Sequence, residues 1–168
     1  AVTRNPTEPV YDTEGRTPIS GGYYYNDGPF KYYNPVAMQN ESTNETLDRE
    51  FSGSVHASLK IIDPLKINAL ASLVETNTRN GYYQTQYYPI DFGTNGRATS
   101  TNSLSSSKQF EVNADFNHSF GDHKIQAIAG YSYYDYWNER YYGMNYGYDT
   151  DIFSFYNMGA GSALSAGK

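Results

Sequence analysis

Aromatic side chains are the most abundant groups in this 168-residue sequence that can contact a ligand, with 19 tyrosines and 8 phenylalanines. A tyrosine ring is apolar on its face and carries a hydroxyl at its edge, so clustered tyrosines can stack on sugar rings and donate hydrogen bonds. The candidate ligand or partner contacts are Tyr24, Tyr25, Tyr83, Tyr88, Tyr142 and Tyr146. Packing within loops would use the same residues and stays open as the alternative.

Catalytic and metal-binding patterns are absent from the sequence. His56, His118 and His123 are scattered without ligand spacing, and Asp149 and Asp151 lack the glycine-centred pattern of a calcium loop. There is no cysteine, which excludes a disulfide scaffold and a thiolate site. A net charge of −6 argues against nucleic-acid binding. We therefore expect no enzyme, no cofactor and no metal.

Two pairs of alternating segments must position the aromatic clusters. Residues 51–74 and 108–137 each alternate apolar and polar side chains, and each has a tight turn at its centre, Asp63-Pro64 and Gly121-Asp122. A period of two places successive side chains on opposite faces of a strand. The sequence therefore predicts two β-hairpins, each with one apolar and one polar face.

About ten alternating residues per strand match the length that crosses an outer membrane in a closed barrel. The apolar face would then contact lipid, and the polar face would line a hydrated interior. A soluble sandwich also alternates, so this pattern alone leaves both architectures open. The predicted lipid-facing residues are Val55, Leu59, Ile67, Ala71, Val112, Ala114, Phe116, Ile125, Ala127 and Ala129. The predicted polar face includes His56, Lys60, Lys66, Asn68, Glu111, Asn113, Asp115 and Asn117.

Aromatic residues at the end of the last strand are predicted to form an interface girdle. They are Tyr131, Tyr133, Tyr136 and Trp137.

The connections favour the membrane architecture. Residues 1–50, 75–107 and 138–168 form long connections at one end of the hairpins, whereas the turns at the other end are short. Outer-membrane barrels combine short periplasmic turns with long extracellular loops. The expected fold is thus all-β, an antiparallel transmembrane β-barrel segment of about four strands. Four strands cannot close a barrel, so we expect the chain to be part of a larger one.

Four segments, in the same order, resemble SusC/RagA-like TonB-dependent outer-membrane transporters. Residues 4–11, RNPTEPVY, and 34–37, NPVA, are similar to two loop sequences of that family. Residues 119–133, SFGDHKIQAIAGYSY, resemble its hairpin, and residues 151–161, DIFSFYNMGAG, resemble an external loop.

The resemblance implies a barrel of about 22 strands in the bacterial outer membrane. It also implies a SusD-like surface lipoprotein as partner, and coupling to TonB through an N-terminal region that this sequence does not contain. The imported nutrient would be an oligosaccharide or a peptide. The alternatives are a secreted, tyrosine-rich β-sheet module for glycan binding or adhesion, and a barrel without a transport role.

Overall fold

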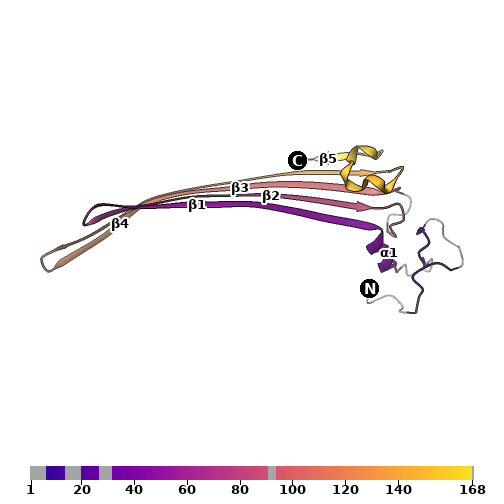
Figure 1. Cartoon of the computed structure of the whole chain (residues 1–168), viewed down its shortest axis with the longest axis horizontal. Helices are drawn as coiled ribbons and strands as arrows, with labels where there is room; N and C mark the ends of the chain where they lie inside the picture. The colour runs from indigo at the N-terminus through magenta and orange to yellow at the C-terminus, as the bar shows by residue number, and fades with distance from the viewer. Residues whose placement is uncertain (1–6, 14–19, 27–31, 91–93, 168) are drawn as a thin grey trace. The chain divides into compact units, whose positions relative to one another are not determined.

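The computed structural model describes residues 7–13, 20–26, 32–90 and 94–167, and β-strands are the main elements of these residues. The elements are α1 (Pro35–Asn40), β1 (Ser42–Ile62), β2 (Leu65–Gln84), β3 (Arg97–Phe120), β4 (His123–Tyr146), the 3₁₀ helices η2 (Asp151–Tyr156) and η3 (Met158–Ala160), and β5 (Ser165–Gly167). The strands form one sheet in the order β1-β2-β3-β4-β5 (Figure 1). The predicted all-β fold class is therefore confirmed.

Both tight turns occur where the sequence predicts them. Residues 63–64 connect β1 to β2, and residues 121–122 connect β3 to β4. Gly121 has a φ of +57°, a left-handed conformation that favours glycine at the first position of a two-residue hairpin turn. At the other turn the ammonium of Lys60 lies 2.7 Å from the carboxylate of Asp63, an exposed ion pair that contributes little stability.

The strands are longer than predicted. Residues 42–50, 75–84, 97–107 and 138–146 were expected in the long connections, but they continue the four strands. These stretches are polar on both faces, so they lack the apolar alternation that identifies a half-buried strand. Cross-strand side-chain bonds occur there instead: the Asn80 amide donates to Asn44 Oδ1 at 2.9 Å and to Thr46 Oγ1 at 2.8 Å.

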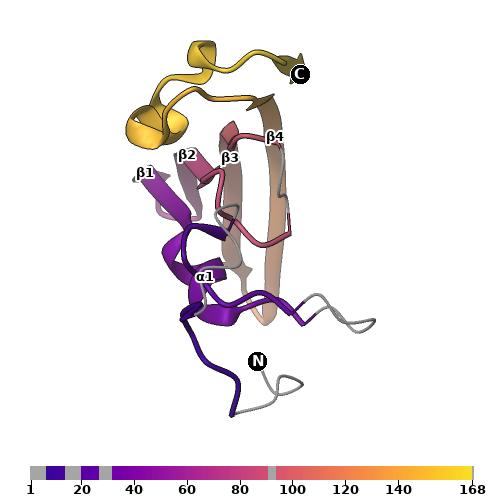
Figure 2. The ribbon, with the colours of Figure 1, turned by 90° about the vertical axis from the view of Figure 1, so that its right-hand side faces the viewer.

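The chain divides into two compact units. The first contains residues 1–47, 79–102 and 140–168, and the second contains residues 48–78 and 103–139. In the first unit a small core is built from Tyr83, Ala98, Tyr148 and Phe155, with Met158 packed against it. Figure 2 shows the yellow segment with η2 and η3 on one side of the strand ends and α1 on another.

Asn34 anchors the segments that precede β1 in the first unit. Its Oδ1 accepts from the backbone N–H of Val36 at 3.1 Å and caps α1, whose first residue is Pro35. Its Nδ2 donates to the carbonyl oxygen of Val10 at 2.7 Å. With only 4% of its surface exposed, this one side chain joins the helix start to an earlier strand-like segment.

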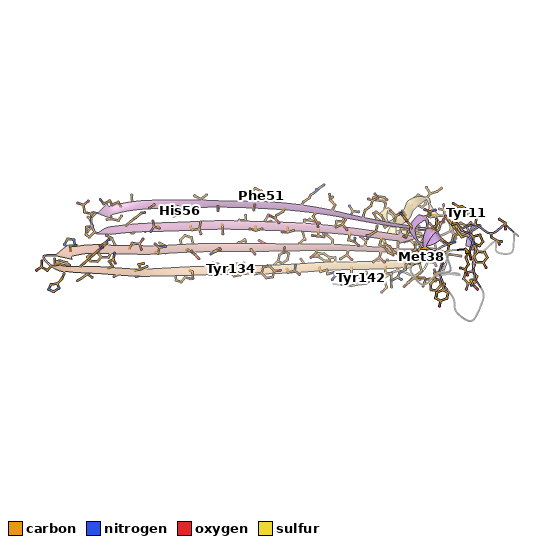
Figure 3. The ribbon with its side chains drawn as sticks, turned by 90° about the horizontal axis from the view of Figure 1, so that it is seen from below. Tyr11, Met38, Phe51, His56, Tyr134 and Tyr142 are labelled. Atoms are coloured by element: carbon orange, nitrogen blue, oxygen red, sulfur yellow. The ribbon has the colours of Figure 1, made fainter. Side chains whose placement is uncertain are left out.

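The second unit consists of strand segments, with side chains projecting from the sheet. Figure 3 shows Phe51 and His56 on β1 and Tyr134 on β4. Large apolar side chains remain exposed here, including Val55 at 71% and Ile128 at 77%. No second sheet packs on this one among the described residues.

Candidate functional site

A polar network crosses three strands in the second unit. Asn68 of β2 accepts a hydrogen bond from the hydroxyl of Ser58 of β1 at 2.8 Å. Its amide donates to Asn113 at 2.8 Å and to the carboxylate of Asp115 at 2.6 Å, both on β3. These four polar side chains therefore share one face of the sheet, as the sequence predicts for their individual strands.

The network extends to β4 through a close backbone approach. A Cβ at Gly130 would lie 3.2 Å from the Cβ of Asn113, so Gly130 also occupies the polar face. Alternation then assigns the odd-numbered residues of β4 near Gly130 to the opposite face. On each strand, the predicted lipid-facing residues lie an odd number of positions from the residue of that strand on the polar face (Ser58, Asn68, Asn113 or Gly130). They therefore share the face opposite the polar network.

The predicted girdle divides between the two faces. The Tyr134 hydroxyl lies 3.3 Å from the hydroxyl of Ser107, an odd-numbered residue of β3 like Asn113, so Tyr134 is on the polar face. Tyr136 follows two residues later and shares that face. The girdle assignment of Tyr136 is therefore corrected, whereas Tyr131, Tyr133 and Trp137 keep the apolar-face positions that a girdle requires.

In the first unit, polar and aromatic side chains gather around Arg97 at the start of β3. The guanidinium of Arg97 lies over the ring of Tyr146, 5.6 Å from its centroid, within the range of a cation–π contact. The Tyr146 hydroxyl donates to Met144 Sδ at 3.0 Å, and the Tyr142 hydroxyl reaches the same sulfur at 3.3 Å. We call this group, with the residues described next, the arginine–tyrosine cluster.

Three neighbouring side chains of β2 and its following loop complete the arginine–tyrosine cluster. Burial raises the pKa of the Tyr82 phenol, and the side chains of Tyr88 and Gln84 lie close enough to its hydroxyl to affect that pKa. Gln84 is only 5% exposed, and its Oε1 has no hydrogen-bond partner. The cluster thus combines one cation, an amide and four phenols, a set that can bind a carboxylate or hydroxyl groups.

The six predicted ligand-contact tyrosines have different environments. Tyr142, Tyr146 and Tyr88 come together in the arginine–tyrosine cluster, although Tyr88 is buried at 7% exposure. Tyr24 and Tyr25 lie elsewhere, and the backbone N–H of Tyr24 donates to Val10 at 3.0 Å. Tyr83 is 2% exposed and points to the face opposite its neighbour Tyr82. Burial makes Tyr83 a packing residue, which corrects its assignment as a ligand contact.

Tyr83 instead fastens the segment after β4 to the sheet. Its hydroxyl donates to the Asp151 carboxylate at 2.7 Å, and its ring meets the Tyr148 ring edge-on at 5.5 Å between centroids. Burial raises the pKa of Tyr148. Nearby, the Phe155 ring occupies the space above Gly81, where any Cβ would collide with it.

The same segment reaches β1 through Tyr156, whose hydroxyl donates to the Glu45 carboxylate at 2.7 Å. This hydrogen bond raises the pKa of the exposed Tyr156 phenol. Asn145 holds the end of the segment, since its amide donates to the Met158 carbonyl at 2.7 Å and its Oδ1 accepts from Ala163 N–H at 2.8 Å. Residues 148–163, which we call the strap, are therefore anchored on β1, β2 and β4.

Sequence reasoning missed Arg97, Gln84 and Tyr82. Arg97 and Gln84 stand at strand ends in polar stretches that were expected to be loops. The sequence did contain one signal, the adjacent residues Tyr82 and Tyr83. Adjacent residues of a strand point to opposite faces, so only one of these two tyrosines can contact a ligand on a given face. Among the described residues no group of acidic, histidine or cysteine side chains could hold a metal ion. No helix in the same part of the chain is long and apolar enough to cross a membrane.

Comparison with known proteins shows which proteins this chain resembles. No protein-family model matches the sequence. TonB-dependent receptor P3 of Formosa agariphila is 28% identical over 134 residues, which cover 77% of this chain and 13% of the receptor. The structure of the RagAB peptide transporter matches with a TM-score of 0.72 at 18% identity, covering 94% of this chain and 18% of that chain. The chain resembles one segment of the SusC/RagA-like TonB-dependent receptors.

This SusC/RagA-like segment spans less than a fifth of the length of either relative. The structural likeness shows the fold, a stretch of antiparallel barrel wall, and the sequence relative supports the family that the four sequence segments indicated. This likeness supports the predicted location in the bacterial outer membrane. The two relatives are a receptor and a transporter, which agrees with the expectation that the chain is not an enzyme.

Proposed function

We propose that the chain forms part of the wall of an outer-membrane transporter that imports nutrients with energy supplied through TonB. The observation that carries this proposal is the division of one sheet into a hydrogen-bonded polar face and an exposed apolar face. Ser58, Asn68 and Asn113 join three strands on the polar face, which suits a hydrated interior. Val55 and Leu59 are exposed on the other face, with 71% and 62% of their surface accessible, as expected for side chains that contact lipid.

Strand length and turn asymmetry support an orientation for this wall. Strands of 20 to 24 residues are about twice as long as the 9–11 residues that cross a bilayer. The apolar face belongs to the half of each strand next to the short turns. We infer that the short turns lie at the periplasmic rim and that the polar halves of the strands extend beyond the outer surface.

The secreted binding module is less well supported. A soluble sandwich would cover the face of Phe110, Val112 and Phe116 with a second sheet. The described residues form a single sheet, and Phe110 is 43% exposed. An apolar face that no protein layer covers is stable in contact with lipid, which supports the membrane wall over the soluble module.

The arginine–tyrosine cluster is the proposed contact for ligand or partner. Arg97 on β3 lies beside Tyr146 on the neighbouring strand β4, within the first unit. Tyr142 is exposed, and Tyr146 is half-buried beside Arg97. Tyr24 and Tyr25, both half-buried, remain further candidates. A SusD-like lipoprotein at the outer surface is the proposed partner. A peptide or an oligosaccharide is the proposed cargo, since the RagAB transporter, which shares this fold, is a peptide transporter.

Replacing Arg97 tests this assignment. In the full-length protein, Arg97→Ala removes the guanidinium and the cation–π contact with Tyr146, so ligand affinity should fall about tenfold. The measurement is uptake of fluorescent peptides and oligosaccharides by cells that carry the variant, at several concentrations.

The matched control is Arg140→Ala, an exposed arginine of β4 outside the arginine–tyrosine cluster. Uptake by this control should equal that of the unaltered protein. An equal loss of uptake in both variants would mean that the total positive charge, and not the position of Arg97, determines uptake. Unchanged uptake in both variants would show that the arginine–tyrosine cluster does not contact the transported ligand. A TonB-deficient strain should take up neither ligand.

A further inference from the structure

A hollow of about 400 Å³ lies on the sheet of the second unit. Its lining includes Arg49, Phe51, Glu75, Leu104, Ser106 and Trp137. Phe51, Glu75 and Ser106 each lie an odd number of residues from the polar-network member on their own strand, Ser58, Asn68 and Asn113. Alternation therefore places the hollow on the apolar face, opposite the polar network.

The hollow begins where the apolar face ends. The apolar residues of this face end at Val55 on β1, Leu73 on β2, Phe110 on β3 and Tyr133 on β4. Charged residues then appear on the same face of all four strands: Arg49, Glu75, Lys108 and Asp135. Phe51 and Trp137 remain 63% and 48% exposed within the hollow. A change from apolar to charged residues across exposed aromatic rings is the pattern of a surface at lipid head-group level.

Two charged side chains of this face line the hollow, Arg49 and Glu75, and both are unpaired. Arg49 and Glu75 form no ion pair or hydrogen bond with each other or with any other described residue. Ser106 Oγ is buried in the same place and has no hydrogen-bond partner among the described residues. The hollow therefore offers a guanidinium, a carboxylate and a hydroxyl to a ligand that carries both charges.

We propose that this hollow binds one membrane lipid with a phosphoethanolamine head group. The phosphate is held by the fork of Arg49 and the amine by the carboxylate of Glu75. Phe51, Leu104 and Trp137 hold the first methylene groups of the acyl chain, which continues along the apolar face. The site rests on the proposed function, because it requires the apolar face to lie in a bilayer.

The test uses the full-length protein in detergent micelles that contain phosphatidylethanolamine or phosphatidylglycerol. Native mass spectrometry measures how much lipid stays bound to the unaltered protein and to Arg49→Gln. The matched control is Lys66→Gln, which removes the same charge from an exposed side chain on the polar face. Heat-modifiable migration on a gel reports separately whether each variant is a folded barrel.

Phosphatidylethanolamine should stay on the unaltered protein and on Lys66→Gln, and bind about tenfold more weakly to Arg49→Gln. Equal retention by Arg49→Gln overturns the site, as does preference for phosphatidylglycerol or displacement of the lipid by inorganic phosphate. These results leave a folded, membrane-embedded barrel in place. Absence of a folded barrel in the unaltered protein would instead overturn the proposed function, and the lipid site with it.

Discussion

An Ala129→Arg substitution in the full-length protein should sharply reduce the amount of folded barrel in the outer membrane. Ala129 lies on the apolar face of β4, next to Gly130, whose backbone approaches Asn113 on the polar face. An arginine facing lipid at the bilayer midplane costs about 2–4 kcal/mol, and less near either interface. The measurement is the heat-modifiable fraction in isolated outer membranes, together with the guanidinium midpoint of the folded protein.

Ser132→Arg is the matched control for this substitution. Ser132 is exposed on the same strand, shares the polar face with Gly130, and forms no side-chain bond with another described residue. An arginine there reaches the hydrated interior, so folding should change by less than about 0.5 kcal/mol. If both variants assembled equally well, the assignment of faces would be wrong.

Gly81→Ala should release the strap from the sheet without unfolding the strands. The added methyl group occupies the volume of the Phe155 ring, which is 5% exposed over Gly81. Overpacking at such a position costs about 1–3 kcal/mol, and here the ring can move outward because it belongs to a short 3₁₀ helix. Hydrogen exchange at residues 151–158 should therefore accelerate, while exchange in β1 to β4 stays slow.

Gly53→Ala provides the comparison, since Gly53 is also a strand glycine. A Cβ at Gly53 would lie 3.7 Å from the Phe51 ring, an ordinary van der Waals distance. Its substitution should leave exchange in the strap unchanged. Unchanged exchange in Gly81→Ala as well would mean that Tyr83, Tyr156 and Asn145 hold the strap without Phe155.

The hairpins and their two faces could be predicted because alternation and turn chemistry are local. Asp63-Pro64 and Gly121-Asp122 interrupt runs of period two, and each run defines a face by itself. The hydrogen bonds that join Ser58, Asn68 and Asp115 follow once the strands pair in register.

The remainder depends on contacts between distant residues. The outer halves of the strands are polar on both faces, so no apolar pattern marks them, and their pairing appears only through bonds such as Asn80 to Asn44. Alternation decides to which face of the sheet each tyrosine side chain points, and it can be applied only when the ends of the strand are known. Tyr83 consequently packs under the strap, whereas its neighbour Tyr82 joins the arginine–tyrosine cluster.

The long polar halves of the strands also bear on function. They carry the arginine–tyrosine cluster and provide the surface on which the strap is anchored. In the proposed wall, the halves next to the short turns contact lipid and the polar halves contact ligand or partner. Substitutions in the two halves should therefore affect assembly and uptake separately.

The most direct test of the membrane-wall account is cysteine labelling along β4 in intact outer membranes. Single cysteines at residues 125–133 of the full-length protein are exposed to a membrane-impermeant maleimide. The account predicts labelling with a period of two, strong at even-numbered residues such as Ser132 and weak at odd-numbered residues such as Ala127 and Ala129. Uniform labelling of both faces would contradict it, because the apolar face would then lie in water.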